Sequence, residues 1–307
     1  MSGSHPSVTT EDRFEQLARL IDPDCRLSGT WQLEGGVSAQ VTALEIVRAD
    51  GCRRRLIMRR HGKVDFARNP RIAAHEFRLL HILHSRGLRT QTPVLLDESC
   101  RIFPSPFLVV EYIEGEPELA PADVAGCVEV MAQLLASIHR LDGANADLSF
   151  LPIETGGGGP RLDPLDNSIG EERIRDALDA ARPVGPTNGP VLLHGDYWPG
   201  NILWQGDRLV GVIDWEDARV GDPLFDLANG RLEILWAYGE EAMQHFTRHY
   251  RSLSNADFTN LPYWDLCAAL RPAHKISEWA LDEPVETRMR EAHAFFVEHA
   301  LQSIANR

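Results

Sequence analysis

The chain has 307 residues, a length that suits one protein with two lobes or two modest domains. Hydrophobic residues make up 43% and charged residues 25%, which is typical of a soluble globular protein. The formal net charge of −14 argues against a nucleic-acid partner, and the lack of a signal peptide or of an apolar run of about 18 residues argues against a membrane. The five cysteines are scattered singly without a CxxC pair, which favours free thiols in a reducing cytoplasm over a disulfide framework or a zinc site.

The first third of the sequence predicts a small unit that is rich in strands. Hydrophobic periodicity and the placement of Asn, Pro and Gly indicate where its elements begin and end. The expected elements are an amphipathic helix over 10–21 capped by Thr10, strands over 40–49 and 54–61, a helix from Asn69-Pro70 to about Arg86, and a strand over 106–113.

The remainder of the sequence predicts a larger unit that is mainly helical. Its expected elements are a long helix over 121–141, a flexible glycine loop over 156–160, a short charged helix over 171–181, a strand and a hairpin over 190–214, and helices from about 223 onward. The predicted elements change from mainly strands to mainly helices near 113–117. The sequence therefore predicts an α+β protein with two lobes, 1–113 and 114–307.

The candidate catalytic residues are polar and lie close together in sequence, in the predicted strand and hairpin. A short apolar strand leads into His194-Gly195-Asp196, and Asn201 follows five residues after Asp196. The hairpin then returns the chain through an apolar strand that ends in Asp214. The sequence therefore places Asp196, Asn201 and Asp214 close to one another.

These three side chains are the set that phosphoryl transfer requires. A carboxylate must orient the attacking hydroxyl and accept its proton, and a hard cation with Asp and Asn oxygen ligands must neutralise the phosphates. Asp196 suits the first task, whereas Asn201 and Asp214 suit the second. Asp and Asn are also common at turns, and taken singly they would be assigned to turns; their joint spacing favours the catalytic interpretation.

The segment HGDYWPGN, followed by GVIDWEDARVGDPLFDLA, resembles the aminoglycoside phosphotransferase family within the protein-kinase-like superfamily. The resemblance extends over roughly residues 25–250. It implies a protein-kinase-like fold with two lobes: a small N-terminal lobe with an antiparallel sheet plus a helix, and a larger, mainly helical C-terminal lobe with a catalytic hairpin. The N-terminal lobe, 1–113, would bind the nucleotide, and the C-terminal lobe, 114–307, would carry catalysis and bind the acceptor.

The resemblance also assigns roles to the residues of the hairpin. Asp196 would be the catalytic base, and Asn201 and Asp214 would be the ligands of Mg²⁺. His194 would orient the loop by hydrogen bonds, and Asp226 would bond loop backbone or cap the helix that it begins, which would hold the catalytic loop in place.

On the nucleotide side, a loop containing Gly36 and Ser38 lies between short strands and would fold over the ATP phosphates with its backbone N–H groups and the Ser38 hydroxyl. It is not a GxGxxG motif, and a simple hairpin turn is the alternative. By the same resemblance, the backbone of Glu111 and Ile113, in the last strand of the N-terminal lobe, would hydrogen-bond the adenine.

The lysine that grips phosphate in this family is replaced by arginine. Arg59 occupies the matching place, and Arg60 points to the opposite face of the strand. Glu76 lies on the apolar stripe of the following helix, where a carboxylate is costly unless it is paired. A pair between Arg59 and Glu76 would satisfy it and would favour Arg59, although a solvated arginine pair with Glu76 at the edge of the stripe is the alternative.

The sequence thus predicts a cytoplasmic small-molecule kinase that uses ATP and Mg²⁺ to phosphorylate a hydroxyl of an acceptor, with an aminoglycoside, a macrolide or an amino alcohol as examples. Aromatic and acidic residues of the C-terminal helices, such as Trp236 and Asp265, would suit a cationic acceptor, although a helical core with an acidic face explains each of them singly. A nucleotide-binding protein without catalysis is the main alternative. A metal hydrolase using Asp196, Asp214 and His194 ranks last, because it lacks a second cluster of metal ligands.

Overall fold

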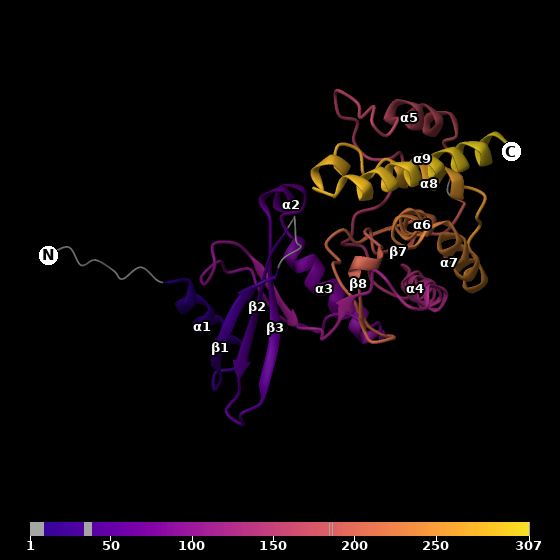
Figure 1. The fold of residues 1–307 in the computed structure, drawn as a ribbon. Helices are drawn as coiled ribbons and strands as arrows, with labels where there is room; N and C mark the ends of the chain where they lie inside the picture. The colour runs from indigo at the N-terminus through magenta and orange to yellow at the C-terminus, as the bar shows by residue number, and fades with distance from the viewer. Residues whose placement is uncertain (1–8, 34–38, 184, 186, 307) are drawn as a thin grey trace. The chain divides into compact units, whose positions relative to one another are not determined.

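The computed structural model describes residues 9–33, 39–183, 185 and 187–306 (Figure 1). The chain divides into two compact units. Unit 1 takes Met1–Glu114 together with Val210–Val212, and unit 2 takes Gly115–Leu209 and Ile213–Arg307. None of the helices in the described part of the chain is both long and apolar enough to cross a membrane. All five cysteines are free thiols, as the sequence predicts.

Unit 1 is built on a five-stranded antiparallel sheet with the strand order β1-β2-β3-β5-β4. Strands β2 and β3, of nine residues each, form a long hairpin whose turn lies at the lower end of unit 1 in Figure 1. The strands are β1 (Arg26–Gln32), β2 (Ala39–Val47), β3 (Arg53–His61), β4 (Pro93–Asp97) and β5 (Phe107–Glu111), and the helices are α1 (Thr10–Ile21), α2 (Lys63–Arg68) and α3 (Ile72–Ser85).

Helix α1 covers one face of this sheet because its apolar stripe repeats at helical spacing. Phe14, Leu17 and Ala18 are buried against strand residues and against Phe103. The helix spans the residues that the sequence predicts, but its cap is Thr9 and not Thr10. The Thr9 hydroxyl accepts from the backbone N–H of Asp12, and the Asp12 carboxylate accepts from the N–H of Thr9, which makes a reciprocal capping box.

Helix α3 packs against β3, β4 and β5. It begins at Ile72, two residues after the predicted start, because Asn69 forms a turn by accepting the N–H of Arg71 with its side chain. Its end matches the prediction: Gly87 adopts a left-handed φ of +74°, and the N–H of Leu88 returns to the carbonyl of Leu83. The short helix α2 was not predicted, because its six residues show no apolar stripe.

Unit 2 contains the remaining elements. Its strands are β6 (Glu116–Pro117), β7 (Val191–Leu193), β8 (Ile202–Gln205), β9 (Arg208–Val212, whose last three residues cluster with unit 1) and β10 (Arg219–Gly221). Its helices are α4 (Val124–Ile138), α5 (Glu171–Ala180), α6 (Leu224–Tyr238), α7 (Glu240–Leu253), α8 (Leu261–Ala269) and α9 (Glu283–Ala305). The predicted hairpin is β8–β9, and the glycine loop 156–160 is irregular, as expected.

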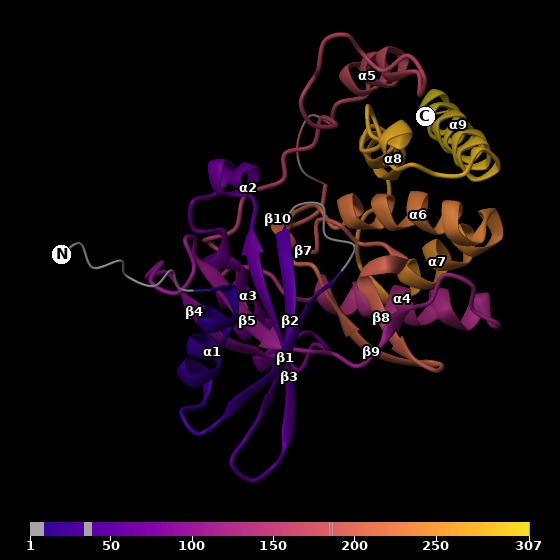
Figure 2. The ribbon, with the colours of Figure 1, turned by 60° about the vertical axis from the view of Figure 1, so that its left-hand side comes forward.

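Helix α6 is the centre of unit 2. It packs against α7, α8 and α9, and Figure 2 shows it between α7 on one side and the pair α8 and α9 on the other. Almost every residue from Leu224 to Leu235 is buried, so this helix has no polar face of the kind that a surface helix shows. Because α6 is enclosed, its first turn can hold the neighbouring loop rigidly.

Candidate active site

The loop between β7 and β8 carries the predicted catalytic residues. Strand β7 is anchored by antiparallel pairing with β10, a strand that the sequence did not reveal because it has only three residues. After Leu193 the chain turns sharply at Gly195, whose φ is +87°. A Cβ atom at this position would lie 2.0 Å from the carbonyl oxygen of Asp217. Glycine is therefore required here both by conformation and by space.

Asp226, in the first turn of α6, fixes this turn from within the core. Its Oδ2 accepts the backbone N–H of His194 at 2.6 Å, and its Oδ1 accepts the N–H of Gly195 at 3.0 Å. Burial by itself raises the pKa of Asp226, but the hydrogen bond and charge of His139, with His194 and the Gly195 N–H, bring it below its ordinary value. The fully buried carboxylate thus holds the loop by two charge-assisted bonds, as the sequence predicts.

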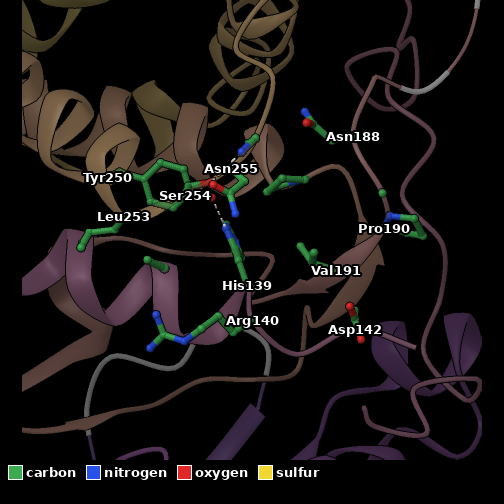
Figure 3. Close-up of a pocket in the computed structure, with 14 residues that line it drawn as sticks. His139, Arg140, Asp142, Asn188, Pro190, Val191, Tyr250, Leu253, Ser254 and Asn255 are labelled. Carbon is green, nitrogen blue, oxygen red and sulfur yellow. Dashed lines mark hydrogen bonds between the residues drawn. The ribbon is translucent and has the colours of Figure 1, made fainter. Parts of the chain in front are cut away.

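A second layer of contacts supports Asp226 from helices α4 and α7. The ring of His139, just after α4, lies 3.3 Å from Asp226 Oδ2 through Nε2 and 2.7 Å from the Tyr250 hydroxyl through Nδ1. Figure 3 shows this ring directed at Tyr250 in a pocket of about 460 Å³, to which Arg140 and Asn255 also contribute. The pocket is joined to the catalytic loop through His139 and Asp226.

Both ring nitrogens of His194 are hydrogen-bonded to backbone groups near the loop. Its Nε2 lies 2.9 Å from the carbonyl oxygen of Ile213, so this nitrogen carries the hydrogen and donates. Its Nδ1 then accepts the N–H of Asp196 at 3.3 Å. The hydrogen-bond network therefore assigns the Nε2–H tautomer, in which both ring nitrogens are engaged with backbone.

Asp196 and Asn201 are in direct contact. The Nδ2 of Asn201 donates to the backbone carbonyl of Asp196 at 2.9 Å and to its Oδ2 at 3.3 Å. The 3₁₀ turn Pro199–Asn201 brings the two residues together. Asn201 is buried, whereas the Asp196 side chain is 34% exposed and open to an approaching molecule.

Asp214 follows closely in space. The N–H of Ile213 donates to the carbonyl oxygen of Asn201 at 2.9 Å, which places Asp214 next to the loop. Its φ is +68°, a left-handed conformation that Asp adopts more readily than most residues and that costs free energy unless the surroundings impose it. The structure thus assembles the three residues that the sequence predicted to lie together.

Asn201 and Asp214 fit a magnesium ion. The Nδ2 of Asn201 donates to Asp196, so Oδ1 is the atom of this amide that would bind a cation. One amide oxygen and one carboxylate are the sparse oxygen set that Mg²⁺ uses when phosphates and water complete its shell. No group of three or more His, Cys, Asp or Glu residues in the described parts of the chain is arranged to hold a metal.

Two ionisable side chains that interact with Asp196 were not found from the sequence. Arg271, in the turn after α8, donates to Asp196 Oδ1 at 2.6 Å and to the carbonyl oxygen of Gly195 at 2.7 Å. Glu233, on α6, has its pKa raised to about 8, first by burial and then by the charge of Asp196, while Arg271 lowers it. Neither residue belongs to a local motif, and the helical periodicity around Glu233 gives no sign that Asp196 influences its pKa.

In unit 1, the predicted pair of Arg59 and Glu76 is present. Their side chains are 8% and 2% exposed, and Arg59 Nη1 lies 3.4 Å from Glu76 Oε1. His61, two residues along the same strand and so on the same face, lies 2.9 Å from Glu76 Oε2. His61 is an addition to the predicted pair, and its two-residue spacing from Arg59 is the signal in the sequence that indicates it.

Arg60 points the other way. Its guanidinium lies 5.0 Å from the centre of the Phe103 ring and contacts Gln40. Burial lowers its pKa, with the charge of Arg13 adding to the effect. The sequence leaves open which of the two arginines replaces the usual lysine, and Arg59 is the one that lies against Glu76.

Of the other residues predicted to bind the nucleotide, the structure describes Glu111 and Ile113. Gly36 and Ser38 lie outside the described residues. Glu111 ends β5, where its N–H donates to the carbonyl oxygen of Thr92 at 2.9 Å and its carboxylate pairs with Arg54. Ile113 lies two residues further along, in irregular backbone. A contact of Glu111 with adenine would therefore use its carbonyl oxygen.

The aromatic and acidic residues of the C-terminal helices differ in exposure: Asp265 is buried, whereas Trp279 is 42% exposed and packs edge-to-face on Trp236. Asp265 is buried and forms a two-point ion pair with Arg231, at 3.0 and 3.1 Å. Trp236 donates its indole N–H to the carbonyl of Met289. These contacts hold Asp265 and Trp236 within the helical packing, and the suggestion that the C-terminal helices bind the acceptor stays a prediction. Trp198, in the catalytic loop, is half-buried, with its ring packed on Gly200.

Comparison with known proteins places the chain in a family. A sequence profile of the phosphotransferase enzyme family matches residues 32–258. Viomycin phosphotransferase of Streptomyces vinaceus is 30% identical over 175 residues, which cover 51% of this chain and 59% of that protein. Acyl-CoA dehydrogenase family member 11 of Homo sapiens is 24% identical over 184 residues, which cover 52% of this chain and only 23% of that protein. The chain thus matches about a quarter of the length of that relative.

The fold is shared with solved enzymes. The GDP complex of aminoglycoside 2'-phosphotransferase-IIIa superposes with a TM-score of 0.65 at 16% sequence identity, covering 95% of this chain and 99% of that one. The expected kinase-like α+β fold is therefore confirmed. The profile match spans most of the chain and includes the whole catalytic loop, so the chain belongs to the phosphotransferase enzyme family.

Proposed function

We propose that this protein transfers the γ-phosphoryl group of ATP to a hydroxyl group of a small molecule. The observation that carries the proposal is the contact of Asn201 Nδ2 with Asp196, with Asp214 brought alongside by the hydrogen bond between Ile213 and Asn201. This arrangement offers one partly exposed carboxylate for a hydroxyl, next to an amide oxygen and a second carboxylate for a cation.

The reaction follows from these positions. The acceptor oxygen forms a bond to the γ-phosphorus as the bond between that phosphorus and the β–γ bridging oxygen breaks, and ADP leaves. Asp196 orients the hydroxyl and takes up its proton. Asn201 and Asp214 would hold Mg²⁺, which when bound supplies positive charge for the phosphate oxygens. Positioning and electrostatics provide most of the acceleration in such transfers.

On the donor side, we assign Arg59 to the phosphates, and Glu76 and His61 to holding its guanidinium in place. A guanidinium can grip two phosphate oxygens at once and keeps its charge at every physiological pH, so it can replace the usual lysine. Gly36 and Ser38 are proposed to cover the phosphates. The backbone of Glu111 and Ile113 is proposed to bind adenine, and unit 1 would thus be the nucleotide-binding lobe.

We propose an amine-bearing acceptor with several hydroxyl groups. The relatives that support this choice are phosphotransferases of viomycin and of aminoglycosides by name. In this chain, Glu233 is partly buried, its pKa is raised first by burial and then by the charge of Asp196, and an acceptor ammonium would favour its ionised form. The dehydrogenase named among the relatives is not proposed, because the match covers 23% of that protein.

The test is a phosphorylation screen with purified protein. ATP or GTP, with and without Mg²⁺, is incubated with viomycin, aminoglycosides, macrolides, choline-like amino alcohols, homoserine and simple sugars, and phosphorylated products are identified by mass spectrometry. We expect one class of acceptor to gain 80 mass units, a phosphoryl group replacing a hydrogen, in a reaction that requires Mg²⁺. Nucleotide binding without turnover across the whole panel would favour the non-catalytic alternative.

A further inference from the structure

Arg271 holds the two residues on which the proposed reaction depends. Its Nη2 donates to Asp196 Oδ1 at 2.6 Å, and its Nη1 donates to the carbonyl oxygen of Gly195 at 2.7 Å. A single planar guanidinium thus binds backbone and side chain of consecutive residues. Bonds of this type between a cation and a carboxylate are short and roughly twice as strong as neutral ones.

Gly195 is held by hydrogen bonds at both its N–H group and its carbonyl oxygen. Its N–H is held by Asp226 from inside unit 2, at 3.0 Å, and its carbonyl oxygen is held by Arg271 from the turn after α8. The peptide groups on both sides of Gly195 are therefore fixed by charged partners from two different helical regions. Since Gly195 is the residue with the left-handed φ, these partners also stabilise the turn that presents Asp196.

The two oxygens of Asp196 are not equivalent. Oδ1 is bound by the guanidinium at 2.6 Å, whereas the contact of Oδ2 with Asn201 Nδ2 is long, at 3.3 Å. An oxygen that already accepts a short bond from a cation is the poorer proton acceptor. Oδ2 is thus the oxygen better suited to accept a hydrogen bond and then a proton from the hydroxyl.

Arg271 itself is well held. Its side chain is 30% exposed, and its guanidinium lies 5.9 Å from the centre of the Phe225 ring, a favourable position for a cation near an aromatic face. It belongs to the segment that links α8 to the last helix of unit 2, and α8 packs on α6. The position of the Asp196 carboxylate therefore depends on how α8 packs on α6, because Arg271 follows α8 and binds this carboxylate.

We propose that Arg271 is a positioning residue for the phosphoryl transfer: it orients Asp196 so that Oδ2 receives the acceptor hydroxyl. This inference rests on the proposed function. It separates two consequences of removing Arg271. Loss of orientation lowers kcat, because an error of about 1 Å in the position of a reacting group costs on the order of 100-fold in rate. The same loss of orientation leaves the KM for ATP nearly unchanged, because Arg271 belongs to unit 2 and is not among the residues proposed to bind the phosphates.

The experiment compares Arg271→Ala and Arg271→Lys with the wild type on the acceptor found in the screen. We expect Arg271→Ala to lower kcat about 100-fold with less than about a twofold change in the KM for ATP. Lysine should restore part of the loss, since it returns a charge but cannot bind both oxygens in a fork. Ethylguanidinium in millimolar amounts should raise the activity of Arg271→Ala several-fold, and ethylammonium should raise it less.

The matched control is Arg290→Ala. Arg290 is an arginine of unit 2 with 26% exposure that is paired with Glu286. We expect it to keep wild-type kcat and to show no response to ethylguanidinium. Thermal melting of each variant identifies a loss that is merely structural.

The outcomes separate the two proposals. Wild-type turnover by Arg271→Ala would overturn the inference alone, and so would a loss that neither lysine nor ethylguanidinium reverses and that parallels a fall in melting temperature. Absence of phosphorylation by the wild-type protein with every acceptor would overturn the proposed function, and this inference with it.

Discussion

The Oδ2 atom of Asp226 lies 2.6 Å from the backbone nitrogen of His194, in a site with no exposure of the aspartate to solvent. Together with the bond from its Oδ1 to Gly195, this contact makes a buried carboxylate on α6 the internal support of the catalytic loop. The support is electrostatic and directional, because both backbone N–H groups point at one ionised side chain.

Replacing Asp226 by Asn should therefore damage both stability and activity. The amide keeps one acceptor oxygen and turns an NH₂ group toward a backbone N–H, which leaves a buried donor without a partner. We expect a loss of about 3 kcal/mol in the free energy of unfolding, measured with denaturant, together with a fall in kcat.

The pH dependence provides a check on the same residue. Since the pKa of Asp226 is lowered in the folded protein, its contribution to stability is present above the ordinary carboxyl range and is lost as pH falls through the folded pKa. The wild type should lose more stability than Asp226→Asn between pH 5 and pH 3, a range that spans the ordinary Asp pKa of about 3.9. Parallel stability curves for the two proteins would contradict this account.

Replacing Asp196 by Asn tests the assignment of the base. The amide retains the size of the carboxylate but cannot take up the proton of the hydroxyl, so kcat should fall about a thousandfold. The dissociation constant for ATP, measured by calorimetry, should stay within about twofold of the wild type, because Asp196 is not assigned to the nucleotide. Retention of full turnover would remove Asp196 from the mechanism.

Arg59 and Arg60 form a natural pair of variant and control, since they are adjacent in β3 and face opposite sides of the sheet. Arg59→Ala should raise the KM for ATP about 30-fold, because a bond between a charged donor and a phosphate oxygen stabilises binding by about 2 kcal/mol. Arg60→Ala, which removes a contact with Phe103, should change this KM by less than about twofold. Equal effects of the two substitutions would show that Arg59 has no special role.

Asp214 should determine the need for magnesium. Chelation with EDTA is expected to abolish phosphoryl transfer by the wild type, and added Mg²⁺ should restore it. In Asp214→Asn, the Mg²⁺ concentration that gives half-maximal rate should rise at least about tenfold, since a neutral amide replaces a carboxylate ligand. A titration of rate against free Mg²⁺ measures the change, and an unchanged midpoint would argue against Asp214 as a ligand.

Glu233 predicts a stability effect that depends on pH. Its pKa rises from an ordinary 4.5 to about 8 in the folded protein, so the folded state retains a proton that the unfolded chain releases. The stability of the wild type should thus decrease as pH rises from about 4.5 to 8 through this group. Glu233→Gln, which resembles the protonated form, should be more stable than the wild type by on the order of 2 kcal/mol at pH 9 and nearly equal to it at pH 4.5. Denaturant unfolding at both pH values would detect the difference, and a constant difference would exclude a raised pKa.

The sequence by itself determined what depends on local spacing. The run from Val191 to Asp214 forms a strand, a turn and a hairpin, and this local order is enough to predict that Asp196, Asn201 and Asp214 lie together. Alternation along β3 and helical spacing along α3 likewise placed Arg59 and Glu76 on facing surfaces. The rule that a buried carboxylate needs a partner then predicted the contact that the structure shows.

Only the tertiary structure decided which distant residues complete the site. Arg271 reaches Asp196 across 75 residues of sequence, and burial together with the charge of the same carboxylate raises the pKa of Glu233, on a helix that is buried on nearly every side. The packing of α6 and α8 places these residues, and no periodic pattern or motif encodes it. The sequence therefore specifies the groups that carry out the proposed chemistry, whereas the packing of helices far along the chain sets the charges that surround them.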